Sequence, residues 1–220
     1  MHYTKNSITN YQSGIELLLH NSLHQHSIKS AVTKFGYSEA QLNHINDLNK
    51  ELTNVVHEVE QAKNEKRIVY RDKNDLLLKI KKQYMRYLKL TRIVLGEDPK
   101  ASEALLLNGT RARTYKELLF QISAFVSNLM NNSSWLNALA VYNIKSDDIE
   151  QLNNRLAELS HLSDKCLEAE GEVRRLTTLK KKKLVTIQGY VSDYVKVVRI
   201  AFEEEPKMLV SLGISTKVDY

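Results

Sequence analysis

The chain contains two diverged copies of one segment, and this repeat constrains the fold more than any other feature. Residues 87–95 read YLKLTRIVL, and residues 194–202 read YVKVVRIAF. Each copy then passes through acidic residues into a Pro-Lys pair, at Pro99 and at Pro206, which are the only prolines of the protein. The offset of 107 residues also pairs apolar positions upstream, and downstream 107–110 resembles 212–216 with a small gap. Duplication predicts two similar structural units.

Helix-breaking residues are few, with 7 glycines and 2 prolines among 220 residues, which predicts an all-α protein. Apolar residues spaced by three and four predict helices over residues 7–21 and 114–130. A short helix is expected after each, with N-caps at Ser27 and at Ser133 or Ser134, and left-handed C-terminal residues at Gly36 and Asn143.

A long apolar-patterned segment follows in each copy. In the first copy, Ser38 and Gln41 have the spacing of a capping box, and apolar residues then recur every three or four positions up to Val59. Residues 61–75 are mostly charged, before the apolar spacing resumes. The charged part is either the tip of an antiparallel hairpin or the middle of one continuous helix. We favour the hairpin, with turns near 72–74 and near Gly171, because a compact bundle requires it.

The predicted fold is therefore an all-α helical bundle built from a tandem repeat with pseudo-two-fold symmetry. Residues 1–110 form the first helical repeat and residues 111–220 the second, packed together as one bundle. Four long antiparallel helices make the bundle, and the shorter helices cover it.

The paired elements resemble a family of uncharacterised bacterial helical proteins with two similar halves. The residues that carry the resemblance are Phe35-Gly36-Tyr37, residues 91–95 and 198–202, Asp98-Pro99, Glu205-Pro206 and Leu212-Gly213. The second turn departs from the pattern, because Asn143 stands where the family has glycine. The resemblance implies a helical fold, no known activity and no functional residue that can be carried over.

The sequence favours a cytoplasmic protein. Its only cysteine is Cys166, so the chain can form neither an internal disulfide nor a cysteine metal cluster. No apolar run is long enough for a membrane span, and residues 1–6 lack the charged and apolar regions of a signal peptide.

Two groups of residues have the types that bind metals, and neither predicts a metal site. Glu158 and His161 form half of a di-iron motif, but the equivalent positions of the first copy hold Glu51 and Asn54. His20, His24 and His26 cluster without the further ligands that zinc needs. His20 and His24 have the i, i+4 spacing of one helix face, but the first helix is expected to end near residues 21–22, before His24. We expect no metal and no cofactor.

Arg92 and Arg199 occupy equivalent positions before the two acidic-Pro turns. We expect a structural role for both, either with the charge extended to solvent or paired with nearby acids such as Glu97 or Glu203.

The densest basic cluster is the candidate contact for an anion or nucleic acid. It comprises Arg174, Arg175, Lys180, Lys181, Lys182 and Lys183. Lys79, Lys81 and Lys82 lie near the equivalent place of the first copy. The net charge of +6 favours anionic partners only weakly, because 26 acidic residues are interspersed among 32 basic ones.

No nucleophile motif and no phosphate-binding glycine loop is present, so no catalytic residue is predicted. The sequence favours a non-enzymatic helical interaction or scaffold protein that binds a protein partner or itself. The alternative is a nucleic-acid-associated protein that uses its basic helix segments.

Overall fold

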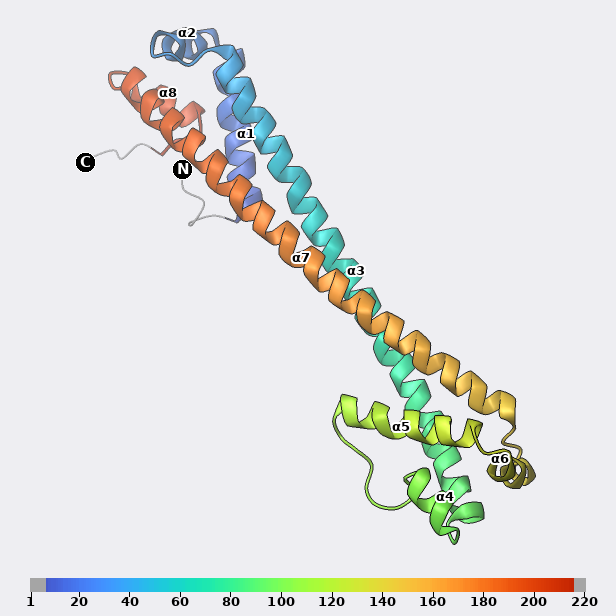
Figure 1. Cartoon of the computed structure of the whole chain (residues 1–220). Helices are drawn as coiled ribbons and strands as arrows, with labels where there is room; N and C mark the ends of the chain where they lie inside the picture. Colours follow the sequence, from blue (N-terminus) through green and yellow to red (C-terminus); the bar gives the residue numbers. More distant parts are fainter. Residues whose placement is uncertain (1–6, 216–220) are drawn as a thin grey trace. The chain divides into compact units, whose positions relative to one another are not determined.

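The computed structural model describes residues 7–215, and every element in this range is helical (Figure 1). This confirms the all-α class. The elements are α1 (Ile8–His24), α2 (His26–Lys34), α3 (Glu39–Leu95), α4 (Pro99–Ala104), α5 (Tyr115–Met130), α6 (Ser133–Leu139), the 3-10 helix η2 (Ala140–Tyr142), α7 (Ser146–Ala201) and α8 (Pro206–Ser211). Residues 1–6, considered above as a possible leader, and Thr216 of the repeat comparison lie outside the described range. None of the described helices combines the length and apolar character that a membrane span requires.

The chain divides into two compact units instead of the single bundle predicted from the sequence. Unit 1 comprises the described residues up to Lys63 and those from Gly171 onward, and unit 2 comprises Asn64–Glu170. Each unit therefore takes the first part of one long helix and the last part of the other. The predicted boundary between residues 110 and 111 separates the two sequence repeats. The two packing units divide the chain at other residues.

The favoured hairpin is wrong, since α3 and α7 each run through their charged middle without a turn. Residues 61–75 contain no glycine or proline, and charged side chains such as Lys63 and Glu60, paired at 2.7 Å, are compatible with a helix. Gly171 is inside α7, where a Cβ would meet no atom within 4 Å. A lone glycine costs a helix only about 1 kcal/mol, which is too little to force a turn.

The helix starts are set by local side chains. Ser38 and Gln41 form the predicted capping box, in which the Ser38 amide donates to Gln41 Oε1 at 2.8 Å. The predicted caps at Ser27, Ser133 and Ser134 are wrong. Helix α1 continues to His24, so the residue that precedes α2 is Gln25 and not Ser27. Helix α6 is capped by Asn132, whose side chain accepts a hydrogen bond from the Trp135 amide.

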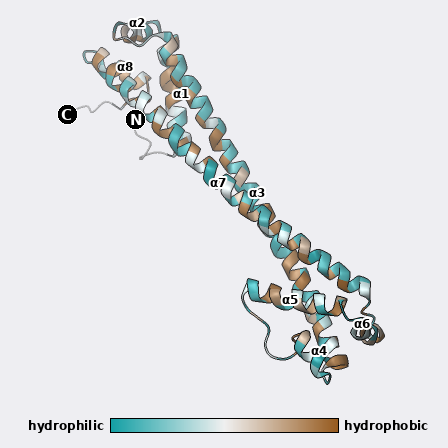
Figure 2. Ribbon diagram, in the orientation of Figure 1, coloured by the Kyte–Doolittle hydropathy of each residue, from teal (hydrophilic) through white to brown (hydrophobic). Residues whose placement is uncertain are grey.

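In unit 1, α1, α2 and α8 pack on the first part of α3 and the last part of α7 around one apolar core. Glu51 of α3 pairs with Lys183 of α7, and Val59 of α3 packs near Leu176 of α7, so the two long helices run antiparallel there. The Tyr194 hydroxyl, fully buried, donates to Ser22 Oγ at 2.5 Å. Burial raises the pKa of Tyr194 to about 12. Figure 2 shows hydrophobic and hydrophilic residues alternating along both long helices, as such one-sided packing requires.

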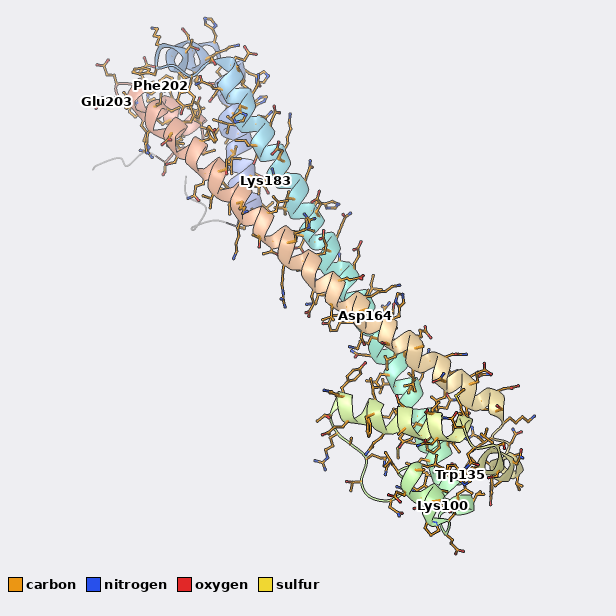
Figure 3. All side chains as sticks on the ribbon, viewed as in Figure 1. Lys100, Trp135, Asp164, Lys183, Phe202 and Glu203 are labelled. Carbon is orange, nitrogen blue, oxygen red and sulfur yellow. The ribbon has the colours of Figure 1, made fainter. Side chains whose placement is uncertain are left out.

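In unit 2, α4, α5 and α6 pack on the last part of α3 and the first part of α7 around a second core. Tyr84 and Phe125 meet edge to face, with ring centroids 5.3 Å apart, and both are fully buried. The Trp135 indole donates to Asp98 at 3.3 Å, which ties α6 to the start of α4, near the labelled Lys100 (Figure 3).

Four turns end helices in the left-handed conformation. Gly36 has φ +87° and Asn143 has φ +57°, as predicted for both residues. Leu106 has φ +51° and Gly213 has φ +67°, and the residue after each donates its amide five residues back, to Ser102 and to Leu209, at 2.9 Å. These turns follow the short elements α2, η2, α4 and α8.

Candidate anion-binding site

Two cations of the predicted basic cluster, which lies on α7 in unit 1, are paired with acidic side chains. Arg175 donates two hydrogen bonds of 2.7 Å to Glu172, which raises the pKa of Arg175 and lowers that of Glu172. The ammonium of Lys183 lies 2.6 Å from Glu51 Oε2. Lys180, Lys181 and Lys182 are consecutive on a helix of 3.6 residues per turn, so they point in different directions.

Unit 2 carries a second concentration of positive charge, which we name the basic face. Lys79, Lys82, Arg86 and Lys89 follow one another on α3 at spacings of three, four and three residues, which places them along one side of the helix. Arg155 joins them from the first part of α7. All four α3 cations are exposed, and Arg155 is partly buried.

The basic face encloses a first cleft of about 380 Å³. Its floor holds Gln83, whose Oε1 accepts from the Arg155 guanidinium and whose Nε2 donates to the Tyr87 hydroxyl at 2.9 Å. This chain of hydrogen bonds restrains Arg155 while leaving donors of its guanidinium for a ligand. The cleft is lined by Lys79, Lys82, Gln83, Arg86, Tyr87 and Arg155.

A second cleft of about 580 Å³ adjoins the first, because Lys82 and Arg86 line both. Lys89 adds a further charge, and Tyr142 contributes an aromatic ring that is 42% exposed. Met85 and Leu90 supply the apolar part of the lining. The second cleft thus combines cations with an accessible aromatic surface.

The charges of the basic face are not neutralised within the described residues. None of its five cations has an acidic side chain within 4 Å in that part of the chain, whereas Arg175 and Lys183 of the predicted cluster each do. Unpaired like charges around a concave surface raise the local positive potential. The arrangement is suited to binding an anion with several charges.

Sequence reasoning noted Lys79 and Lys82 but missed Arg86, Lys89 and Arg155. Arg86 and Lys89 could have been found, since they continue the spacing of three and four from Lys79 and Lys82 along one helix face. Arg155 gave no such signal, because it reaches the face only through the packing of α7 on α3.

The metal-ligand candidates do not form a site. Among residues 7–215, no group of three or more His, Cys, Asp or Glu side chains is placed to hold a metal ion. His20 and His24 share α1, contrary to the prediction, and their rings stack with centroids 4.4 Å apart. Glu158 and His161 are exposed on α7.

Arg92 and Arg199 bind backbone carbonyls, and not the nearby acids considered from the sequence. Arg92 donates to the carbonyl of Leu107 at 2.5 Å and to that of Gly109 at 3.4 Å. Arg199 donates to the carbonyl of Ser215 at 3.2 Å. Both arginines hold the segment that follows the short helix of their unit, which is a structural role.

No protein-family model, curated protein or solved structure matches this chain. The basic face must therefore be interpreted from its own geometry and charge.

Proposed function

We propose that this chain is a non-enzymatic helical interaction protein that binds an anionic partner through the basic face of unit 2. One observation carries the proposal: five cations that have no acidic partner among residues 7–215 line two adjoining clefts. Holding like charges together is unfavourable unless something compensates for it, and a bound polyanion does so.

Binding suits the basic face better than catalysis does. The residues that line the two clefts are cations, an amide, two phenols and apolar side chains. They include no carboxylate, imidazole or thiol, the groups that most often act as general bases or nucleophiles.

We also propose that the chain arose by duplication, with the halves 1–110 and 111–220 related by a pseudo-two-fold axis, as in the bacterial family that it resembles. Buried residues of the two cores pair at the offset of 107, among them Ile15 with Ile122, Leu52 with Leu159, Tyr87 with Tyr194 and Leu105 with Leu212. The left-handed residues pair in the same way, Gly36 with Asn143 and Leu106 with Gly213. The pair Leu106 and Gly213 keeps the offset of 107, so the ends of the two copies can be aligned without the small gap that the sequence comparison placed between 107–110 and 212–216.

Self-association is a second candidate, because large apolar side chains are exposed at matched positions of both units. Leu78 and Val185 are 64% and 71% exposed, and Ile93 and Ile200 are 68% and 59% exposed. Exposed apolar positions that recur in this way favour a protein contact. A cytoplasmic setting stays part of the proposal, supported by a single, buried cysteine.

The proposed function is tested with a short fluorescent inorganic polyphosphate, followed by fluorescence anisotropy over a range of salt concentrations. The variant Lys82→Glu/Arg86→Glu reverses the two cations that both clefts share. The matched control is Lys181→Glu/Lys182→Glu, which makes the same change of net charge within the cluster predicted from sequence. Wild type is expected to bind in a salt-dependent manner.

We expect the unit 2 reversal to weaken binding by about tenfold or more, and the control reversal by roughly threefold or less. Equal weakening by the two variants would mean that only net charge matters and would overturn the proposed site. Circular dichroism establishes that both variants remain helical, as expected for exposed positions.

A further inference from the structure

We infer that the anionic partner is a single-stranded nucleic acid, whose phosphates follow the basic face and one of whose bases stacks on Tyr142. This inference rests on the proposed function and narrows it to one class of ligand. It draws on three features of unit 2: the linear order of the cations, the restrained guanidinium of Arg155 and the exposed ring at one end.

The cations form a row and not a cluster around a point. From Lys79 to Lys89 the helix rises about 15 Å, at 1.5 Å per residue. Four charges distributed over that length match a chain of successive phosphates better than they match a single small anion. A flexible single strand can follow such a row and release counterions from each phosphate that it places there.

Arg155 supplies a fixed point beside this row. Its guanidinium donates to Gln83, which in turn donates to Tyr87, so the planar group is held by side chains of the opposite helix. A restrained guanidinium can still donate two parallel hydrogen bonds to a phosphate. By binding one phosphate in this way, Arg155 would fix the position of the nucleic-acid strand along the row of cations.

Tyr142 presents the aromatic surface. It ends η2, where Asn143 adopts the left-handed conformation and Ile144 donates its amide to the carbonyl of Leu139 at 3.3 Å. This turn fixes the backbone on which the ring stands, beside Lys89 in the second cleft. An exposed ring next to a cation is the arrangement with which proteins stack an unpaired base while holding its phosphate.

Other polyanions fit less well. A membrane surface is broad, whereas the cations and Tyr142 line concave clefts of limited volume. A duplex keeps its bases stacked inside, so it cannot use the Tyr142 ring. An acidic protein surface offers carboxylates but no planar group for stacking on the ring.

The experiment compares a short labelled single-stranded RNA with an abasic phosphodiester polymer of the same length, again by anisotropy. Tyr142→Ala removes the ring, and Tyr142→Phe retains it. Phe35→Ala is the matched control, since Phe35 is the residue of unit 1 at the offset of 107 and is similarly exposed, at 50%. Anionic vesicles that contain phosphatidylserine serve as the membrane probe.

Wild type and Tyr142→Phe are expected to bind the RNA about fivefold or more tightly than the abasic polymer, and Tyr142→Ala is expected to lose that preference. Phe35→Ala should retain it. Equal binding of the two polymers by wild type, or binding of vesicles without binding of RNA, would overturn the nucleic-acid inference. In either case, sensitivity to Lys82→Glu/Arg86→Glu would leave the proposed anion binding in place. Insensitivity of every probe to that variant would overturn both.

Discussion

The two units differ in the charge on one side of their long helices. In unit 2 this side of α3 carries the row of cations Lys79, Lys82, Arg86 and Lys89. The positions 107 residues later, on the part of α7 in unit 1, hold Thr186, Gly189, Asp193 and Lys196. Lys196 is paired with Asp193 at 2.8 Å, whereas the four cations of the α3 row have no such partner in the described residues. The cores of the two units use matching positions, but these two surfaces carry different charge. The proposed binding therefore depends on residues that differ between the copies, and not on the repeated core.

The interiors also differ at a few polar positions. Asn49 of unit 1 is buried with a side-chain oxygen that has no partner among the described residues, and Leu156 stands at the matching position of unit 2. Thr91 of unit 2 is buried with a hydroxyl that likewise lacks a partner in the described range, and Val198 stands at the matching position of unit 1. Each unit thus indicates which substitution the other would accept.

The largest effect is expected from truncating a core side chain of one unit. Phe125→Ala in unit 2 should lower the free energy of unfolding by about 3–5 kcal/mol, and Leu18→Ala, at the matching position of unit 1, by about 2–5 kcal/mol. Urea denaturation measures the totals. Hydrogen exchange should show protection lost first within Asn64–Glu170 for Phe125→Ala and within unit 1 for Leu18→Ala.

Phe120→Ala is the control for this comparison, because Phe120 lies on the same helix as Phe125 but is 69% exposed. It should change stability by less than about 0.5 kcal/mol. Equal loss of protection over the whole chain in both core variants would show that the two units unfold as one.

Alkaline pH should destabilise unit 1 through its buried tyrosines. Burial raises the pKa of both Tyr11 and Tyr194 from 10.0 to about 12, so folding favours the neutral phenols. Their contribution is complete below pH 10 and is lost as the pH rises from about 10 through about 12. Each tyrosine should account for roughly 2–3 kcal/mol of that loss.

The measurement is the free energy of unfolding in urea at pH 9 and at pH 11 for wild type and Tyr194→Phe. The variant should show a smaller decrease between the two values, since only Tyr11 of the pair still titrates. An identical decrease in both proteins would mean that Tyr194 does not resist ionisation in the folded state.

A smaller effect, a gain in stability, is expected when Thr91 of unit 2 is replaced by valine, the residue at the matching position of unit 1. Thr91→Val removes the buried, unpartnered hydroxyl and keeps a similar shape, so stability should rise by about 1 kcal/mol. The reciprocal variant Val198→Thr should destabilise unit 1 by a similar amount. Thermal denaturation of the two variants checks the signs, and a loss of stability in Thr91→Val would contradict the assignment.

The smallest effect concerns the continuity of α7. Gly171→Ala should stabilise the protein by about 0.5–1 kcal/mol, because a helical residue replaces glycine where the added Cβ has free space. Urea denaturation measures it. A clear destabilisation would indicate a turn at this residue, as the sequence had suggested.

Several local interactions were predictable from the sequence, although the caps at Ser27 and at Ser133 or Ser134 were not, and non-local contacts were not predictable. The capping box at Ser38 and the left-handed residues Gly36 and Asn143 depend on neighbouring residues, and all three were predicted correctly. The path of the charged residues 61–75 was not predicted correctly. Charged side chains are compatible with a helix and with the tip of a hairpin, and packing decides between the two. The contact between Arg155 and Gln83 joins residues 72 positions apart, so no local pattern contained it.

The most direct measurement transfers the basic face to unit 1. Thr186→Lys/Gly189→Lys/Asp193→Arg would align with Lys196, and a Cβ at Gly189 meets no atom within 4 Å. Titration with the labelled polyphosphate should then show a second binding event, weaker than the first because Leu48 stands at the position that matches Arg155. A folded triple variant with only the original binding event would contradict the claim that this row of unpaired cations makes the site.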